Sequence, residues 1–351
     1  MNLKLNQFNI SLELVLYSNS FQFILALITL SNFFIFGCTS DESYDNSDFI
    51  SEVETNLPAS VPFVAVGGSN SSEGNGYILL TSDDGNTWEN ISLDSLNLTS
   101  GSRFHDVTYG NGMYVVVGDS GNILYSKNSK EWSRIKLEGS KSHGYVSIAY
   151  GKNRFFATGG TNSTDSVILI ESNDGINWNS SFSKLGIEVG KSIEFCMDMF
   201  FLITDNRCLK SEDETNWGTS VTCNFSGNPK QYCINNKIHV TESSNAIYKS
   251  LDGNSFTSIT FPSTSSTGIA YGNDLYVVGS SANIYYNLSF ISVGWSQTTN
   301  FPDNSGTILS IIYRKSKFIA AGGNSIIYKS DDGLNWTRVN SGTSNTINSI
   351  Y

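Results

Sequence analysis

The amino-acid sequence predicts an all-β fold built from seven copies of one repeat, and three observations support this prediction. The 351 residues include 31 Gly, 13% aromatic residues and only 15% charged residues, a composition typical of short strands joined by tight turns. A short phrase that ends in an aromatic residue returns along the chain at a regular spacing. The last five residues repeat a phrase that begins the earlier copies.

The spacing of the repeated phrase indicates a propeller. The phrase is TSDDGNTWEN at its first copy and KSDDGLNWTR at its last, and every Trp of the chain falls in a copy. The aromatic residues that end the copies are Trp88, Trp132, Trp178, Trp217, Phe256, Trp295 and Trp336. They stand roughly 40 positions apart, which is the period of four-stranded propeller blades. We therefore expect a single seven-bladed β-propeller over residues 61–351.

Each copy contains the pattern of an antiparallel meander. In SIAYGKNRFFATGG and GIAYGNDLYVVGSS, apolar residues alternate in short strands, and Gly, Asn and Asp separate them. Three such strands lead into the repeated phrase, whose aromatic residue begins a fourth strand. Each blade is therefore expected to be one four-stranded antiparallel sheet.

The turn before each fourth strand has residues with mechanical roles. The oxygens of Ser82 and Asp84 accept hydrogen bonds from the nearby backbone, and Gly85 allows a positive φ. Trp88 supplies a large apolar surface, and we expect it to be buried. The same roles fall to Ser172, Asp174, Gly175 and Trp178, and to Ser330, Asp332, Gly333 and Trp336. Because the acids stand on separate turns around the ring, we expect a structural role rather than catalysis or calcium binding.

The chain ends predict how the ring closes. The sequence INSIY, residues 347–351, repeats the first-strand phrases VSIAY and LSIIY. The first blade opens with FVAVGG, which matches second-strand sequence in other copies. We expect the C-terminal strand to pair beside Phe63–Val66 as the first strand of the first blade, because this closure removes an open sheet edge.

The repeated phrase resembles the Asp box of the bacterial neuraminidase repeat. The family box is Ser-x-Asp-x-Gly-x-x-Trp, whereas this chain has Ser-x-Asp-Gly-x-x-Trp, and residues 127–129, residues 213–214 and the sixth copy depart further from it. Propellers of this superfamily include sialidases, xyloglucan-active glycoside hydrolases, sortilin-type receptors and the photosystem II assembly factor family. The resemblance covers about residues 63–351 and implies the same propeller fold.

The N-terminal residues predict export. Phe21–Phe36 is almost uncharged but shorter than the about 20 apolar residues of a spanning helix, so it fits the apolar region of an export signal. Ile35–Cys38 resembles the lipobox of bacterial lipoproteins, which implies that residues 1–37 are removed and that Cys38 carries a lipid. An uncleaved anchor and a misassigned start codon are the alternatives. Residues 38–60 are expected to form an acidic flexible tether.

This resemblance also implies a location. A lipid on Cys38 would place the protein in the bacterial cell envelope, attached to a membrane. Thr39, rather than an acid, follows the cysteine and favours the outer membrane or the cell surface over the inner membrane.

Charge and motif content exclude several classes of function. The net charge of −11 argues against nucleic acid or anionic lipid as a partner. The sequence has no P-loop, dinucleotide fingerprint or nucleophile elbow. His105, His143 and His239 lack the spacing of a zinc site. We therefore expect no cofactor, no metal and a monomer.

A glycoside-active enzyme is the rival of a binding protein. The resemblance to sialidases implies an arginine triad on the face opposite the boxes, but only Arg103 and Arg207 of the six arginines are expected to reach it. Two convergent carboxylates would still suffice for a glycosidase. The candidate acids on that face are Glu73, Asp106, Asp119, Asp165, Glu188, Asp205, Glu242 and Asp303. The alternative is that they are scattered on a solvated rim, with no catalytic residue among them.

Four cysteines follow Cys38, and export permits disulfides. Cys208 on a third strand and Cys223 on the next fourth strand stand nearly equidistant from their turn, so a cross-strand disulfide is expected. Cys196 and Cys233 lie near the ends of neighbouring first strands, and a bridge between them would join two blades. Free buried thiols are the alternative.

Ligand contact is expected on loops, because rigid scaffolds commonly carry function there. The segments 68–76 and 160–166 are long polar loops between second and third strands. With them, the candidate binding rim consists of Arg103, His105, His143, Arg207, Glu73 and Asp165. We expect an exported, lipid-anchored propeller that acts as a non-catalytic binding or assembly platform for a protein or a glycan. A glycosidase or sialidase-like enzyme is the alternative.

Overall fold

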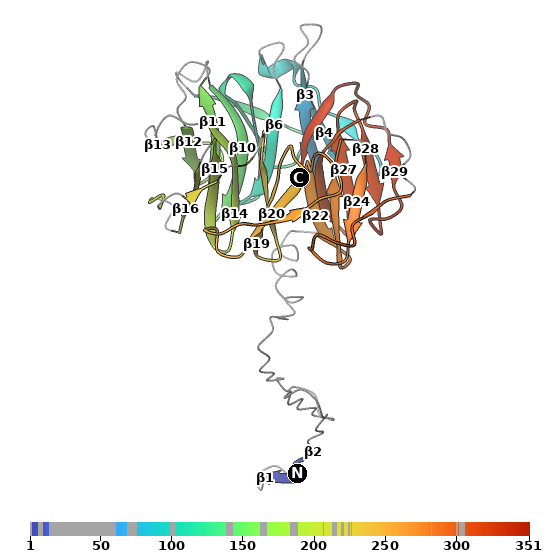
Figure 1. Cartoon of the computed structure of the whole chain (residues 1–351). Helices are drawn as coiled ribbons and strands as arrows, with labels where there is room; N and C mark the ends of the chain where they lie inside the picture. The colour runs from blue at the N-terminus through green and yellow to red at the C-terminus, as the bar shows by residue number, and fades with distance from the viewer. Residues whose placement is uncertain are drawn as a thin grey trace. The chain divides into compact units, whose positions relative to one another are not determined.

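The computed structural model of the chain describes residues 2–5, 10–13 and 61–351, except 69–75, 99–102, 138–142, 162–166, 183–188, 206, 213–215, 219–220, 224, 226, 282, 300 and 302–305. From Phe63 onward, the described residues form seven four-stranded antiparallel sheets. Figure 1 shows these sheets side by side around a common centre. The predicted seven-bladed β-propeller is therefore confirmed.

The blades are numbered in chain order, and each is a meander. Blade 1 contains β30 (Thr346–Ile350), β3 (Phe63–Gly68), β4 (Tyr77–Ser82) and β5 (Glu89–Asn90). Blade 2 contains β6 (Phe104–Gly110), β7 (Met113–Gly118), β8 (Asn122–Ser126) and β9 (Ser133–Lys136). Blade 3 contains β10 (His143–Gly151), β11 (Arg154–Thr161), β12 (Val167–Ser172) and β13 (Asn179–Phe182). Blade 4 contains β14 (Gly190–Cys196), β15 (Met199–Thr204), β16 (Arg207–Ser211) and β17 (Val221–Thr222).

The remaining blades follow the same order. Blade 5 contains β18 (Lys230–Ile234), β19 (Lys237–Thr241), β20 (Ala246–Ser250) and β21 (Thr257–Thr260). Blade 6 contains β22 (Gly268–Gly272), β23 (Leu275–Gly279), β24 (Ile284–Asn287) and β25 (Ser296–Gln297). Blade 7 contains β26 (Ile308–Arg314), β27 (Lys317–Gly322), β28 (Ile327–Ser330) and β29 (Thr337–Val339). Two short 3₁₀ helices, η1 (Asp94–Leu96) and η2 (Asp119–Gly121), lie in connections.

The chain closes the ring through β30, as the sequence predicts. β30 pairs antiparallel with β3, with Ala65 opposite Ile350 and Gly68 opposite Thr346. Beyond the strand end, the N–H of Tyr351 donates to the carbonyl of Val64 over 2.9 Å. Because the C-terminal strand supplies the first strand of blade 1, blade 1 has four strands like the other six.

A belt of hydrogen bonds joins the first strands of neighbouring blades. Its members are Asp106, Ser147, Ser192, Ser310 and Ser349, which occupy equivalent positions in five first strands, each with a register shift just before it. The backbone N–H of Ile350 donates to Ser310 Oγ (3.3 Å), that of Ile148 to Asp106 Oδ2 (3.0 Å), that of Ile193 to Ser147 Oγ (3.2 Å) and that of Gln231 to Ser192 Oγ (3.1 Å). The extra residue of each bulge turns the next side chain toward the adjacent blade.

A second set of contacts locks the blades on one face, which we call the box face because the Ser-Asp-Gly turns lie on it. At five junctions, a side chain on one blade donates to a backbone carbonyl in the box turn of the next. These bonds are Asn111 Nδ2 to Asn173 O (3.5 Å), Lys152 Nζ to Glu212 O (2.8 Å), Lys210 Nζ to Asp252 O (3.5 Å), Asn273 Nδ2 to Asp331 O (2.8 Å) and Lys315 Nζ to Asp83 O (2.7 Å). First-to-second turns and box turns therefore share one face.

The apolar core lies between blades, and the tryptophans are less buried than the sequence suggested. Separate buried clusters contain residues from neighbouring sheets, such as Phe318 of blade 7 with Val277 of blade 6. Only Trp336 among the six tryptophans is buried, at 4% exposure, and the others are partly exposed. The expectation that each indole is buried is wrong, because the fourth strand is the outer edge of its blade and leaves one side of the ring toward solvent.

Two disulfides lie in blades 4 and 5. Cys196 bonds to Cys233, with their Cα atoms 5.3 Å apart, and joins the first strands of the two blades. Cys208 bonds to Cys223 across the outer strands of blade 4, with their Cα atoms 5.6 Å apart. The structure thus has the cross-strand disulfide that the sequence predicted, and also the bridge between Cys196 and Cys233 that the sequence left open. Each restricts the unfolded chain and so stabilises the fold.

The chain divides into two units, residues 1–50 and residues 51–351. Of the first unit, the structure describes residues 2–5 and 10–13. Its described strands, β1 (Asn2–Leu5) and β2 (Ile10–Glu13), pair antiparallel. Among the described residues, no helix is long and apolar enough to cross a membrane. The predicted export signal core, Cys38 and the acidic tether lie outside the described residues.

We expect replacement of Gly333, in the box turn of blade 7, to be costly for reasons of space as well as backbone conformation. Gly333 and Gly342 have nearly equal φ values, +75° and +70°, but a Cβ at Gly333 would lie 2.8 Å from Leu275 Cδ2, whereas a Cβ at Gly342 would meet nothing within 4 Å. Gly342→Ala should therefore cost about 1 kcal/mol for the backbone alone. Gly333→Ala should cost about 1 to 3 kcal/mol more, because it also overpacks the junction between blades 6 and 7. Urea unfolding measures both, and equal losses would contradict the packing argument.

Candidate functional site

The face opposite the boxes, called here the opposite face, has a charged cluster at blade 2. Arg103 precedes β6, His105 lies in β6, and Asp119 begins η2 between β7 and β8. His105 Nε2 lies 2.6 Å from Asp119 Oδ1, and Arg103 Nε lies 3.8 Å from Asp119 Oδ2. The backbone N–H of Arg103 also donates to Asp119 Oδ2 over 3.1 Å. The sequence predicted Arg103 and His105 for the rim, and the structure brings both to the carboxylate of Asp119.

The surroundings of Asp119 keep it ionised. Burial alone would raise the pKa of Asp119, but the hydrogen bond and charge of His105, with smaller contributions from Arg103, lower it below its ordinary value. The side chains of Arg103 and Asp119 are 41% and 33% exposed, so a ligand can reach both. A Cβ built on Gly68 of blade 1 would touch Arg103, and one on Gly144 of blade 3 would lie 3.6 Å from Asp119 Oδ1. The cluster therefore sits where three blades meet.

Of the other predicted rim residues, Arg207 is the one whose side chain the structure describes, and it lies in blade 4 rather than at the junction of blades 1, 2 and 3. Arg207 begins β16 of blade 4, where its backbone N–H donates to Thr204 Oγ1 over 3.1 Å. His143 begins β10, but its side chain lies outside the described residues. The predicted residues Glu73, Asp165, Glu188 and Asp303 also lie outside the described residues.

The remaining predicted acids of this face have partners in the protein. Asp205 Oδ1 lies 3.1 Å from Lys191 Nζ, and Asp205 Oδ2 accepts a bond from the N–H of Val189 over 3.2 Å. Glu242 is buried, at 3% exposure, and accepts hydrogen bonds from Ser244 Oγ and Tyr248 Oη. These interactions favour a structural role for both carboxylates.

Asp106 is an acceptor in the inter-blade belt. Its carboxylate receives four donors, the hydroxyls of Ser147 (3.1 Å) and Ser349 (2.8 Å) and the N–H groups of Val107 (2.9 Å) and Ile148 (3.0 Å). A carboxylate has about four lone-pair sites, so these bonds use its acceptor capacity. The structure thus gives Asp106 a task in holding blades 1, 2 and 3 together.

Sequence reasoning missed three titratable residues, Glu194, Lys230 and Tyr232, that lie with the predicted Asp106 at the centre of the ring, and we call these four residues the channel cluster. All lie on first strands, which are neighbours around the centre. Lys230 Nζ of blade 5 donates to the carbonyls of Leu309 in blade 7 (2.9 Å) and Asn348 in blade 1 (3.1 Å). Because blade 5 borders neither blade, these bonds cross the central channel.

Burial shifts the protonation of the channel cluster. Removal from water raises the pKa of Glu194 to about 8, although the N–H of Phe195 donates to its carboxylate over 3.0 Å, and the negative charge of Asp106 adds to the rise. Burial lowers the pKa of Lys230, and Asp106 partly offsets that change. Near neutral pH, Glu194 is therefore largely uncharged, which leaves Asp106 as the counter-charge of Lys230.

A signal for this cluster was present in the repeats. The first-strand phrases VSIAY, LSIIY and NSIY have Ala, Ile or Tyr after the Ser-Ile pair, whereas the fourth copy, KSIEF, has Glu194. An acid at a position where other copies are uncharged was a detectable exception. In the fifth first strand, Lys230 stands where other copies have serine, and Gln231 stands where they have isoleucine.

The residues of the box turns form a repeated set of hydrogen bonds on the box face. In blade 7, Ser330 Oγ accepts from the N–H of Gly333 (2.8 Å), and Asp332 Oδ1 accepts from the N–H groups of Leu334 (2.8 Å) and Asn335 (2.7 Å). Trp336 Nε1 donates to the carbonyl of Gly333 over 3.1 Å. The side-chain oxygens of Ser82 and Asp84, and those of Ser172 and Asp174, accept the equivalent bonds from backbone N–H groups of their own turns. Trp88 Nε1, however, has no hydrogen-bond partner.

These bonds lower the pKa of the box carboxylates. The side chain and the N–H of Asn86 hold the pKa of Asp84 at about 2. Burial opposes the same effect at Asp174 and Asp332, but the bonds from the turn backbone prevail and again give pKa values of about 2. A carboxylate that is ionised and committed to its own turn is a poor proton donor, so the box acids are unsuited to general acid catalysis.

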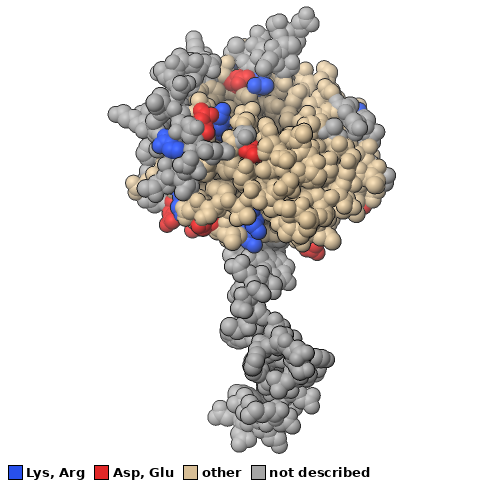
Figure 2. All heavy atoms as spheres, in the orientation of Figure 1, with Lys and Arg blue, Asp and Glu red and all other residues tan. Residues whose placement is uncertain are grey.

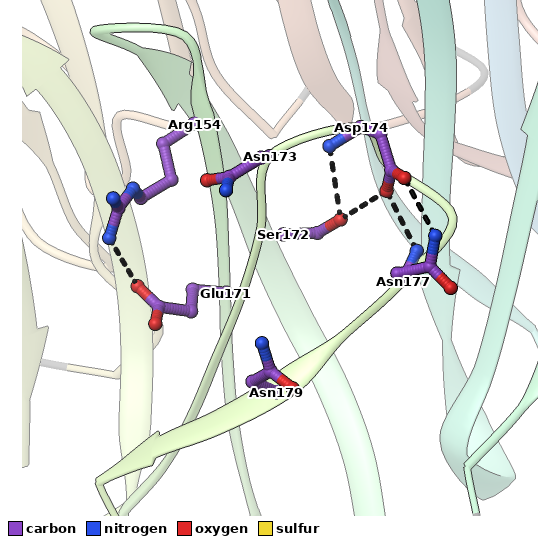
Figure 3. Close-up of a pocket in the computed structure, with 7 residues that line it drawn as sticks. All are labelled: Arg154, Glu171, Ser172, Asn173, Asp174, Asn177 and Asn179. Atoms are coloured by element: carbon purple, nitrogen blue, oxygen red, sulfur yellow. Dashed lines mark hydrogen bonds and ion pairs between the residues drawn. The ribbon is translucent and has the colours of Figure 1, made fainter.

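One hollow of about 220 Å³ lies at the box turn of blade 3. Its lining is polar and consists of Arg154, Glu171, Ser172, Asn173, Asp174, Asn177 and Asn179. Figure 3 shows that Arg154 pairs with Glu171 while Ser172 and Asn177 hold Asp174. The charged groups are thus satisfied within the protein. Among the described residues, no group of three or more His, Cys, Asp or Glu side chains is placed to hold a metal ion.

Comparison with known proteins identifies the fold but not a family. Neither a protein-family model nor a curated protein sequence matches this chain. YCF48 from Cyanidioschyzon merolae is similar in structure, with a TM-score of 0.55 and 14% sequence identity over 72% of this chain and 88% of that chain. A structure described as YCF48 bound to D1 peptide has a TM-score of 0.55 and 16% identity over 80% of this chain and 93% of that chain.

We expect Glu194 to make stability depend on pH. Its pKa in the folded protein, about 8, lies above its ordinary value of 4.5, so the folded state binds more protons between these values and stability falls as pH rises through that window. Glu194→Gln removes this loss. The free energy of unfolding of the variant relative to wild type should be constant below pH 4.5, should rise between pH 4.5 and 8, and should level off above. Denaturant titrations across this range measure the difference, and parallel profiles would contradict a protonated Glu194 in the folded protein.

Proposed function

We propose that this chain is an exported, lipid-anchored propeller that serves as a non-catalytic platform and binds a protein or peptide segment on its opposite face. The observation that carries the proposal is the partly exposed cluster of Arg103, His105 and Asp119, held by backbone and side-chain bonds where three blades meet. The similarity to YCF48, one structure of which is described as bound to D1 peptide, supports a protein ligand by fold-level analogy.

The cluster has the chemistry for polypeptide recognition. Arg103 is a donor for a ligand carboxylate or carbonyl, and Asp119 is an acceptor beside it for a ligand N–H or ammonium group. The ring holds both without the ordering entropy of a flexible site, which favours binding. In Figure 2, the charged side chains of the described residues are scattered, and most of the surface in view is uncharged.

The glycoside-active alternative has weaker support from the described residues. Asp106 is saturated by donors, Asp205 pairs with Lys191, and Glu242 is buried beside two hydroxyls. A glycosidase needs two carboxylates that face one sugar across a cleft. The binding experiment described next also tests whether the ligand is a glycan.

We expect the binding variants to separate the cluster from the rest of the surface. Arg103→Gln combined with His105→Gln should reduce capture of the cognate protein from a cell-envelope extract about tenfold, because each loses a charge-assisted contact. Arg338→Gln, on the exposed outer strand of blade 7, is the matched control and should bind like wild type. Quantitative mass spectrometry of captured proteins is the measurement. Equal capture by all three proteins, or binding confined to a glycan array, would refute the proposed protein site.

The anchor makes a separate prediction. Mass spectrometry of the mature protein should find Cys38 as the first residue with an attached diacylglycerol, and Cys38→Ser should leave the chain unprocessed. An unmodified Cys38 would overturn the membrane attachment and leave the binding site on the opposite face untouched.

A further inference from the structure

The exposed apolar side chains of the propeller gather on one side of the box face. Among the described residues, the large apolar side chains that are exposed are Leu251 (54%), Leu288 (74%), Ile291 (48%), Val293 (69%) and Leu334 (37%). They stand on the turns between third and fourth strands of blades 5, 6 and 7, three consecutive blades. We call these five residues the apolar rim. Scattered surface leucines need no explanation, but a set confined to one face of three adjacent blades marks a contact surface.

Blade 6 contributes most of the apolar rim because its box turn is different. Between β24 and β25 it has the sequence LSFISVGW, without the Asp-Gly pair of the other boxes. The corresponding turn of blade 7 keeps its polar residues Asp332 and Asn335 in hydrogen bonds of the box. The change in blade 6 thus replaces a polar turn by one that presents three apolar side chains.

The turn of blade 6 is held firmly, so the exposed side chains cannot fold back into the core. Asn287 Nδ2 donates to the carbonyl of Val293 over 2.9 Å, and Trp295 Nε1 donates to the carbonyl of Ile291 over 2.8 Å. Between them Phe290 is buried, with its ring 4.5 Å from that of His239 in blade 5. The turn therefore buries one apolar residue and holds its neighbours in water, which is unfavourable unless another apolar phase covers them.

The N-terminal segment joins the propeller on this same face. Arg314 Nη2 donates to the carbonyl of Pro62 over 2.7 Å and to that of Val61 over 3.1 Å. Arg314 ends β26, and the following Lys315 donates to the carbonyl of Asp83 in the box turn of blade 1. Sixty residues precede Val61, including the apolar stretch 21–36 and Cys38. The chain thus enters the propeller at Val61 on the box face, where the apolar rim also lies.

We propose that the apolar rim docks on the surface of a lipid bilayer. This inference rests on the proposed membrane anchor for its geometry. Leu288, Ile291 and Val293 enter the boundary between headgroups and acyl chains, where apolar side chains on a surface-bound element are buried by several ångströms. Trp295, partly exposed at the end of the same turn, is the residue type favoured at that boundary. Docking in this way turns the cluster of Arg103, His105 and Asp119 away from the membrane.

Site-specific fluorescence in vesicles tests this contact. The full chain, purified with its lipid, carries Val293→Cys labelled with the environment-sensitive dye NBD and is reconstituted in phosphatidylcholine vesicles. The four downstream cysteines are paired in disulfides, so the new thiol is the reactive one. We expect the emission to shift to shorter wavelength and to be quenched at least about twofold when doxyl-labelled lipid is included.

Two matched positions set the baseline. Ser281→Cys lies on the turn between β23 and β24 of blade 6, on the opposite face, and Asn173→Cys lies on the box turn of blade 3; both are exposed. Neither should be quenched. Adding Leu288→Ser and Ile291→Ser to the Val293→Cys chain should bring its quenching down to that baseline. All substituted residues are exposed, and thermal unfolding checks that each variant is folded.

Each other outcome overturns the proposal in a distinguishable way. Absence of quenching at Val293 in a chain whose lipid is verified by mass spectrometry means that the propeller stands off the bilayer, while the anchor itself survives. Quenching at the Ser281→Cys position would mean that the opposite face, and not the box face, lies toward the bilayer. A shift at Val293 that occurs without vesicles and grows with protein concentration assigns the apolar rim to a second copy of the chain.

Discussion

The pairing of β30 with β3 is the interaction on which the rest of the structure depends. Six blades are continuous meanders, whereas blade 1 is completed only by non-covalent contacts between the two ends of the propeller. Side-chain bonds concentrate at this junction: Ser349 donates to Asp106 over 2.8 Å, Asn348 donates to a carbonyl of β6 over 2.7 Å, and Lys230 caps the carbonyl of Asn348. A carboxylate at the Asp106 position suits the junction because it accepts from blades 1 and 3 at once, which a serine hydroxyl does less well.

A ring closed in this way tolerates divergence in its turns. The second copy of the box has Asn128 and Ser129 in place of Asp and Gly, yet Asn128 Oδ1 accepts from the N–H groups of Lys130 and Glu131, and Ser129 adopts a φ of +61°. The turn geometry is kept although the sequence signature is lost. Blade 6 goes further and exchanges the polar turn for an apolar one, while Phe290 fills the junction with blade 5. The belt and the hydrogen-bonded box turns of the other blades hold the ring together, so the box turn of blade 6 can differ in sequence without loss of the fold.

The architecture could be predicted from the sequence because three patterns agree on one fold. These patterns are the repeat period, the alternation of apolar residues in the strands and the matching phrases at the two chain ends. The disulfide pairs followed from the same register, since Cys208 and Cys223 flank one turn and Cys196 and Cys233 end adjacent first strands. The channel cluster escaped for a physical reason. A bulge precedes the belt residue in five first strands and shifts the alternation of side chains between the two faces of the strand by one residue. A strict period of two therefore did not show that Glu194 faces the ring interior. The rim could be predicted only in part, because its geometry depends on Asp119, a neighbour in space of His105 but not in sequence.

The two faces of the ring differ because of the path of the chain, and this difference bears on how a platform would work. First-to-second turns, box turns and the junction with the N-terminal segment all fall on the box face, so the proposed anchor and the proposed membrane contact would act from one side. The opposite face is formed by second-to-third turns and blade connections, and it holds the ion pairs of Asp119 and Asp205. Salt at physiological strength screens exposed charges over roughly 8 Å. If the box face docks on a bilayer as proposed, a charged site on the opposite face would be electrostatically independent of the lipid headgroups, and it would select ligands by its own charges.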